Sequence, residues 1–396
     1  MSTLLFGIEC KQSPDWLTRL SQCKRYTPSV IGSNYQPLGT KWLSRPINDE
    51  IASRKQNQIV SVQLSTSTSI LFFGGWSPSR NSKCNDIHEL QEGSSQVRLK
   101  RRRCEWSPRC GLLVHASCDG RVLYVIGGDD GRIRSDIWIS VDGGTTFRER
   151  SDEAPWGGRV LYSTCLIDTD TILLCGGVSV ESEYFADTWI TRDQGVTWQL
   201  QSGKCPWGSR KGMCVIRLHD GSVLLAGGSS DNRAYDDVWK TWDLGLTWTC
   251  LNDRAPWKAR QGLSMIQDPL SFEIVMVGGT DYTGHVLCDS WASIDGGKSW
   301  VSRSRLPSDT SPQIVPIVSN NGTLSIFTMG CHDSSTKSFL SQSDLKFIRR
   351  DCAFLLMLGK RLEKEIPREI WSGKVLPMAI DIRSLWNRES SEWGKL

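Results

Sequence analysis

A pair of glycines recurs five times along the sequence at nearly constant spacing, and each pair ends a short apolar run such as LYVIGG or VLLAGG. The pairs are Gly74–Gly75, Gly127–Gly128, Gly176–Gly177, Gly227–Gly228 and Gly278–Gly279. The second glycines of successive pairs are 53, 49, 51 and 51 residues apart. A period of this length indicates a repeated unit that buries its apolar faces against neighbouring copies.

Three further motifs recur in phase with the glycines. An Asp-x-Trp segment follows each pair, at 136–138, 187–189, 237–239 and 289–291, whereas the first copy reads Asp86-Ile87-His88. A Ser/Thr-x-Asp-x-Gly-x-x-Trp/Phe segment comes next, at 140–147, 191–198, 241–248 and 293–300. A Trp-x-x-Arg segment begins the following unit, at 106–109, 156–159, 207–210 and 257–260. Most of the 18 tryptophans therefore occupy repeated positions, which predicts a structural role for them.

Each unit reads as four short strands. One strand follows the arginine, a second ends at the glycine pair, a third carries Asp-x-Trp, and a fourth begins at the aromatic residue after the Asp-x-Gly turn. The aspartate can accept hydrogen bonds from the turn backbone, and glycine tolerates the left-handed conformation that such turns need. Because one four-stranded sheet cannot bury both of its faces, the units are expected to stack radially with tryptophan between them. The sequence predicts an all-β propeller.

The glycine pair, the tryptophan that follows it and the arginine that opens each unit resemble the kelch repeats of galactose-oxidase-like and kelch β-propellers, whose period is about 50 residues. The Ser/Thr-x-Asp-x-Gly-x-x-Trp/Phe segments resemble the Asp-box turns of sialidase-type propellers. These motifs cover residues 54–305. The resemblance implies a closed ring of blades, since an open end would expose unpaired strand edges. Pairing of an N-terminal strand into the last blade is one route to closure.

We predict six four-stranded blades, with seven as the alternative if residues 30–52 add a blade or half-blade. The predicted boundaries are 53–105, 106–155, 156–206, 207–256, 257–305 and 306–350. The first blade lacks the Asp turn, and the last has Gly330-Cys331 in place of a glycine pair. Residues 1–52 are expected to be an N-terminal extension that can contribute a closing strand.

Residues 351–396 change to a helical pattern. The segment DCAFLLMLGKRL at 351–362 has one apolar face, and Pro367 suits the first turn of a second helix. Residues 366–376 are similar to the opening of an F-box helix pair, although their spacing is one residue longer. We favour a short helical C-terminal segment that caps the propeller or a second copy of the chain. A role as a ubiquitin-ligase component is the alternative that the similarity implies.

Composition and charge limit the class of protein. The 396 residues carry a formal net charge of +4, which is too small to indicate a nucleic-acid partner. No apolar run reaches the roughly 18 to 20 residues of a membrane-spanning helix, so no membrane partner is expected. No secretory signal pattern is present, and none of the 14 cysteines forms a Cys-x-x-Cys pair. We therefore expect a cytoplasmic protein, with a nuclear location as the alternative that the basic run 100–103 allows.

The repeated aspartates do not by themselves indicate catalysis. In sialidase-type propellers the Asp-box lies in a turn away from the active site, which assigns Asp142, Asp193, Asp243 and Asp295 to turns. A glycosidase needs two carboxylates across the scissile bond or a tyrosine nucleophile, and no such set is identifiable. The five histidines form no metal-binding pair, and no phosphate-binding loop is recognisable. We predict a non-enzymatic protein without a cofactor or metal.

Loops that vary in sequence on a constant frame are where recognition sites usually lie. The loop after each glycine pair and the linker between blades are expected on one face, and these segments are rich in Tyr and Arg, which are common at binding hot spots. The residues predicted to bind a partner are Arg132, Arg134, Tyr184, Arg233, Tyr235 and Tyr282 in loops, and Arg159, Arg210 and Arg260 in the repeated frame. For the frame arginines, pairing within a neighbouring blade is the competing interpretation.

The sequence thus predicts a protein–protein interaction scaffold or adaptor. It would bind a protein partner through the glycine-pair loops, and the arginines favour an acidic peptide segment in that partner. The alternative function is a sialidase-like carbohydrate-active enzyme or lectin. That alternative requires a carboxylate pair converging on the central channel.

Overall fold

The computed structural model describes residues 43–46, 51, 54–63, 68–91, 94, 96–117, 120–268, 272–303, 305, 310–318, 324–330 and 337–343. All described strands belong to one compact unit, which spans residues 1–27 and 36–343. The helices predicted within 351–396, including the F-box-like segment, lie outside the described residues. Within the described part of the chain we find no helix that could cross a lipid bilayer.

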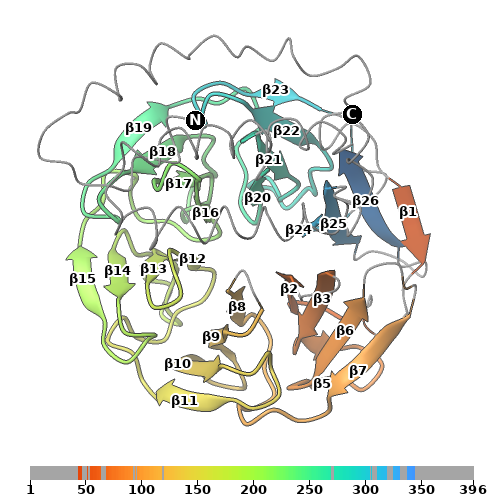
Figure 1. The fold of residues 1–396 in the computed structure, drawn as a ribbon. Helices are drawn as coiled ribbons and strands as arrows, with labels where there is room; N and C mark the ends of the chain where they lie inside the picture. The colour runs from red at the N-terminus through yellow and green to blue at the C-terminus, as the bar shows by residue number, and fades with distance from the viewer. Residues whose placement is uncertain are drawn as a thin grey trace, which may run out of the picture. The chain divides into compact units, whose positions relative to one another are not determined.

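Five blades are four-stranded antiparallel sheets whose strands follow one another in the chain (Figure 1). Blade 1 contains β2 (Gln58–Gln63), β3 (Thr68–Phe73), β6 (Ile87–Gln91) and β7 (Val97–Arg101). Blade 2 contains β8 (Leu113–Ala116), β9 (Leu123–Asp129), β10 (Ile133–Ser140) and β11 (Arg148–Ser151). Blade 3 contains β12 (Ser163–Leu166), β13 (Ile172–Cys175), β14 (Thr188–Thr191) and β15 (Gln199–Ser202). Blade 4 contains β16 (Cys214–Arg217), β17 (Val223–Ala226), β18 (Val238–Thr241) and β19 (Thr249–Asn252). Blade 5 contains β20 (Ser264–Gln267), β21 (Ile274–Val277), β22 (Ser290–Ser293) and β23 (Val301–Ser302).

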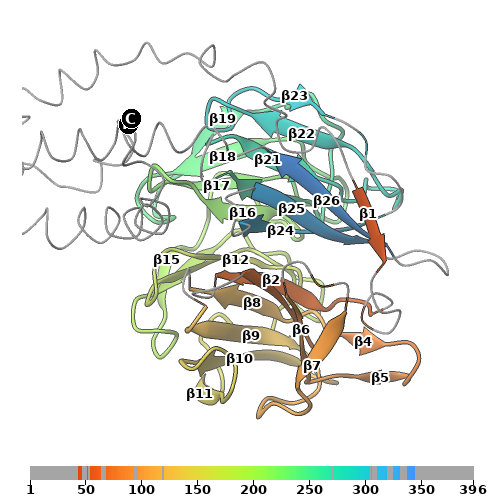
Figure 2. The same ribbon diagram turned by 45° about the vertical axis from the view of Figure 1, so that its right-hand side comes forward.

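A further four-stranded sheet, which we call the closing sheet, combines strands from both ends of this unit. It contains β1 (Leu43–Pro46), β24 (Thr310–Val318), β25 (Leu324–Gly330) and β26 (Lys337–Ser343). Its order is β1-β26-β25-β24, and β1 runs antiparallel to β26 with Leu43 opposite Leu340. Figure 2 shows β1 beside β26. A short hairpin of β4 (Trp76–Ser77) and β5 (Ser82–Lys83) lies in the glycine-pair loop of blade 1.

The first strands of the blades contact one another in succession. Strand β8 contacts β2 and β12, β16 contacts β12 and β20, and β24 contacts β20 and β2. Each sheet therefore adjoins two others around a common centre, as Figure 1 shows. This arrangement places the first strands innermost and the fourth strands outermost.

The structure confirms a propeller of four-stranded antiparallel blades but does not confirm the predicted count of six or seven. Five blades have four consecutive strands. Residues 306–350, predicted as a complete sixth blade, contribute three described strands, β24 to β26. The fourth strand is β1, which lies in the segment considered for a seventh blade. The physical reason is edge pairing, because β1 occupies the outer edge of β26.

Tryptophan fills the space between blades, as its periodic spacing predicts. Trp106, Trp156, Trp207 and Trp257 are at most 3% exposed, and each belongs to an apolar cluster that joins two successive blades. Trp207 packs edge-on against Trp248 with ring centroids 6.2 Å apart, and Trp257 packs in the same way against Trp300 at 6.3 Å. Perpendicular packing of this kind adds to the stabilisation from burying the rings themselves.

The glycine pair permits close approach of the next blade. Gly227 and Gly228 have φ values of +65° and +102°, which favour glycine. A Cβ on Gly227 would lie 2.8 Å from the backbone oxygen of Arg260 in blade 5. The amide of Gly228 donates a hydrogen bond to that same oxygen at 2.8 Å. The pair therefore both ends the second strand and fixes the junction between blades 4 and 5.

The replacement Trp207→Ala should lower the free energy of unfolding by roughly 3–5 kcal/mol, because it removes a fully buried indole ring between blades 3 and 4. Urea denaturation followed by circular dichroism measures this effect. The matched control is Trp242→Ala, since Trp242 is 65% exposed. That control should change stability by less than about 1 kcal/mol. Equal losses in the two variants would contradict a role for Trp207 between the blades.

Candidate functional site

A buried arginine–aspartate pair lies at the same place in every one of the five blades. The arginine that opens the blade forms an ion pair of 2.5–2.7 Å with the aspartate of the Asp-x-Trp or Asp-x-His motif, which lies immediately before the third strand or, in blade 2, within it. The pairs are Arg54–Asp86, Arg109–Asp136, Arg159–Asp187, Arg210–Asp237 and Arg260–Asp289. These arginines are at most 3% exposed. The guanidinium groups lie inside the blades.

The Arg210–Asp237 pair illustrates the contacts around each arginine. Arg210 donates hydrogen bonds to Asp237, to the carbonyl oxygen of Gly227 at 3.0 Å and to the carbonyl oxygen of Trp207. The indole nitrogen of Trp239 donates to Asp237 at 2.8 Å. In blade 1, His88 replaces the tryptophan, and its Nε2 lies 3.1 Å from Asp86. The ion pair thus connects the linker, the end of the second strand and the start of the third strand.

Three of the predicted partner-binding residues are these buried arginines, Arg159, Arg210 and Arg260. Their burial does not match the expectation that they face a partner at an exposed rim. The competing interpretation, pairing within a blade, agrees with the observed contacts, because each carboxylate accepts from the arginine of its own blade.

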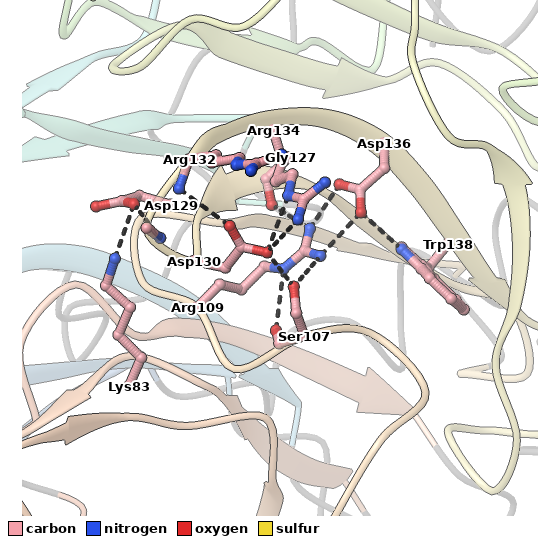
Figure 3. A network of polar contacts seen from close by, with 11 residues as sticks. Lys83, Ser107, Arg109, Gly127, Asp129, Asp130, Arg132, Arg134, Asp136 and Trp138 are labelled. Carbon is pink, nitrogen blue, oxygen red and sulfur yellow. Dashed lines mark hydrogen bonds and ion pairs between the residues drawn. The ribbon is translucent and has the colours of Figure 1, made fainter.

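Arg132 lies in the glycine-pair loop of blade 2 and Arg134 near the start of β10, close to the buried pair of that blade (Figure 3). Asp130 accepts hydrogen bonds from the side chain of Arg134 at 2.9 Å and from the backbone amide of Arg132 at 3.1 Å. It also accepts from Ser107 at 2.6 Å, and Ser107 in turn accepts from Arg109 at 2.8 Å. These contacts tie the loop to the linker below it and engage the Arg134 guanidinium within the protein.

Tyr184, Arg233 and Tyr235 come together at a surface cavity of about 540 Å³, which we call the arginine cavity. Tyr184 comes from the loop of blade 3, and the other two come from the loop of blade 4. The full lining is Tyr184, Ser209, Ser230, Asp231, Asn232, Arg233 and Tyr235. The structure therefore brings three of the nine predicted residues into one concave site.

Tyr235 lies between two guanidinium groups. The buried Arg210 lies 3.7 Å from the centre of the ring, and the exposed Arg233 lies 4.5 Å from it. Burial raises the pKa of Tyr235, but hydrogen bonding with Ser230 and Arg233 and the charges of both arginines outweigh it, so the pKa is lowered. Its backbone amide donates to Gly228, and its carbonyl accepts from the amide of Arg260. The frame therefore fixes the position of this ring.

A second cavity of about 370 Å³ adjoins the first, and we call it the tryptophan cavity. Tyr184 and Ser209 line both cavities. The other lining residues are Glu183, Phe185, Ala186, Asp187, Trp189, Leu200, Gly203 and Lys204. Leu200 on the outer strand β15 is 46% exposed.

Tyr282 does not line either cavity, although it touches the loop that does. Its hydroxyl donates a 2.7 Å hydrogen bond from blade 5 to the backbone oxygen of Asp231 in blade 4. The ring remains 53% exposed. Tyr282 therefore supports the loop of the arginine cavity from the neighbouring blade.

The sequence analysis did not predict a binding role for the polar residues of the arginine cavity, Ser209, Ser230 and Asn232, or for Leu200 of the second cavity, and it gave Trp189 a structural role only. The expectation that linkers and loops share one face could have pointed to Ser209, which directly precedes a frame arginine. No sequence motif marks Leu200. Its exposure results from its place on the outermost strand, which depends on the assembled blade and not on a local pattern.

The repeated turn aspartates are engaged within their own turns. Asp193 accepts hydrogen bonds from the hydroxyl of Thr191 at 2.8 Å and from both the amide and the hydroxyl of Thr197 at 2.9 and 2.6 Å. Partial burial raises the pKa of Asp142, but hydrogen bonds from Thr146 and Ser140 outweigh it and lower the pKa to about 2. These carboxylates therefore stay ionised and stabilise the turns.

The histidines of the described residues lie in separate environments. His115 on the innermost strand of blade 2 contacts the hydroxyl of Thr164 in blade 3 at 2.7 Å, and burial lowers its pKa to about 4. His219 packs edge-on against Phe272. Across the described part of the chain, no three His, Cys, Asp or Glu residues are grouped so that they could hold a metal ion.

Comparison with known proteins does not identify a family for the chain. None of the protein-family models matches the chain, and no match was found among the curated proteins.

Replacing Asp237 with Asn should lower the free energy of unfolding by roughly 3–5 kcal/mol, because the charge of Arg210 would stay buried without its counter-ion. The matched control is Asp236→Asn at the adjacent position, where burial raises the pKa of the carboxyl. That control should change stability by no more than about 0.5 kcal/mol. Urea unfolding of both variants measures the difference, and similar midpoints would argue against the buried pair as a structural requirement.

Stability should fall between pH 6.5 and pH 4 because of His115. The unfolded side chain takes up a proton near its ordinary pKa of 6.5, whereas the folded one does so only at about 4. The contribution of the neutral His115 ring to the free energy of unfolding is complete above pH 6.5 and is lost as the pH falls to about 4. Its expected size is roughly 1–3 kcal/mol, because the ring is half-buried. Urea midpoints at pH 7 and pH 4.5 measure it. The variant His115→Gln should show a shallower dependence, and an unchanged slope would contradict the assignment.

Proposed function

We propose that the chain is a kelch-type propeller without enzymatic activity that acts as a scaffold or adaptor, and that it binds a protein partner over the arginine cavity. The observation that carries this proposal is the concave site formed by Tyr184, Arg233 and Tyr235 on the loops of blades 3 and 4. Tyrosine and arginine are enriched at the hot spots of protein interfaces. A ring that the frame already fixes loses little conformational entropy on binding.

The charge around the cavity favours an acidic segment in the partner. Arg233 is exposed at the cavity, and Lys211 lies 5.4 Å from the ring of Tyr184. Asp231 is the carboxylate in the lining, so the two cations exceed it by one charge. The planar guanidinium group of Arg233 can donate two parallel hydrogen bonds to a carboxylate. Ser209 adds a hydroxyl group beside it, whereas the hydroxyl of Ser230 donates to Asn232 at 2.9 Å.

The proposal extends to the kind of propeller. The turn contacts of Asp193, which recur at Asp243 and Asp295, support an Asp-box-like interpretation of the turns. The recurring pairing of arginine with the aspartate before tryptophan supports kelch-like repeats. We further propose that the closing sheet acts as a sixth blade, since β24 contacts both β20 and β2.

The double variant Arg233→Glu/Tyr235→Ala should lose the partner. In quantitative affinity purification from cell lysate, at least one protein captured by the wild-type chain should fall by about tenfold or more, as expected for the loss of a hot spot. Titration of that protein in purified form then measures the change in affinity directly.

The matched control is Arg192→Glu/Trp242→Ala, which makes the same kinds of change in turns between third and fourth strands, where both residues are exposed. This control should leave capture unchanged, and circular dichroism should show that both variants remain folded. Undiminished capture by the cavity variant, or loss only in the control, would refute binding at the arginine cavity.

A further inference from the structure

The two cavities form adjoining parts of one surface, since Tyr184 and Ser209 line both of them. A ligand that occupies the arginine cavity therefore has the tryptophan cavity directly beside it. The chemistry of the two linings differs, and this difference restricts what a ligand spanning both can be.

The wall of the tryptophan cavity is more apolar than that of the arginine cavity. Phe185, Trp189 and Leu200 contribute to it. The indole nitrogen of Trp189 donates to Asp187 at 2.8 Å, and Asp187 also accepts from Arg159 at 2.7 Å. These polar groups are therefore used within the blade, and the rings and the leucine remain as the surface available to a ligand.

The charges at the tryptophan cavity balance each other. Glu183 and Lys204 are exposed residues of its lining, and Asp187 is neutralised by Arg159. The arginine cavity, in contrast, has Arg233 and the nearby Lys211 against Asp231. Charge complementarity thus directs an acidic group to the first cavity and an uncharged apolar group to the second.

We propose that the tryptophan cavity is a second subsite, and that the partner segment is an extended peptide carrying an acidic side chain for Arg233 and an apolar side chain for the pocket of Trp189 and Leu200. This inference rests on the proposed function, because it assigns the substrate class of the same site. Recognition of an extended segment through pockets for particular side chains is a common mode of peptide binding.

The test is selection of a library of random linear peptides on the immobilised full-length chain. Peptides enriched on the wild type should share an acidic residue and an apolar residue at a constant spacing. Selection on Leu200→Lys should keep the acidic residue and lose the apolar preference. Selection on Arg233→Glu should lose the acidic residue.

One enriched peptide then measures the coupling between the pocket and the apolar side chain. Replacing its apolar residue with alanine should weaken binding to the wild type by about tenfold, but should have little further effect on Leu200→Lys. The matched control is Val301→Lys, since Val301 is a 61% exposed apolar residue on the outer strand of blade 5. This variant should select the same peptides as the wild type.

The outcomes separate the two proposals. Enrichment of acidic peptides with no apolar preference, unchanged in Leu200→Lys, overturns the second subsite and leaves the proposed function standing. Failure to enrich any peptide, or enrichment unaffected by Arg233→Glu, overturns the proposed function at the arginine cavity. Enrichment of the two-residue pattern with the expected response of each variant supports both.

Discussion

The buried arginine–aspartate pair is the interaction on which each blade depends. Placing two charges inside a protein is unfavourable unless their geometry and remaining hydrogen bonds compensate for lost hydration. Arg210 donates from its two terminal nitrogens to Asp237, Gly227 and Trp207, which lie just before the third strand, just after the second strand and in the linker. The backbone oxygen of the corresponding arginine in blade 5 accepts from the amide of Gly228. Each pair therefore orders its own blade and the junction with the previous one.

The same frame supports the candidate site. Arg210 contributes to it without facing solvent, because its guanidinium lies under the ring of Tyr235. Arg159 lies in the same way against Phe185, 3.8 Å from the ring centre, in the loop of blade 3. The frame arginines thus set the positions of loop aromatics that a partner can contact. The repeat determines where these rings lie, and the variable loops determine which chemistry surrounds them.

Periodicity predicted most of the fold, because glycine pairs, tryptophans and turn aspartates are local signals that each blade repeats. The burial of Arg159 was harder to assign, since its partner Asp187 is 28 residues away in the sequence. Arg and Asp recur together in every unit, even in blade 1, where Arg54 lacks the tryptophan motif. This joint recurrence was the sequence feature that indicated an arginine–aspartate pair. An N-terminal closing strand was expected as one route to closure, and β1 pairs with β26 in this way. Its exact position and register could not be predicted, because the pairing joins segments nearly 300 residues apart without a repeated motif.

The linker and the glycine-pair loop are joined by a side-chain contact in some blades and not in others, and the arginine cavity lies in a blade without it. In blade 2, Ser107 of the linker donates to Asp130 of the loop at 2.6 Å, and in blade 5 Lys258 donates to Asp281 at the same distance. Blade 4 has Gly208 and Ser230 at the two equivalent positions, so this connection between linker and loop cannot form. Blade 3 also lacks these side chains, with Gly157 and Ser179 at the two positions. In blade 4, Ser209 and Ser230 line the arginine cavity beside the missing contact. The arginine cavity thus lies in a blade that lacks the linker–loop contact but retains the buried pair beneath it.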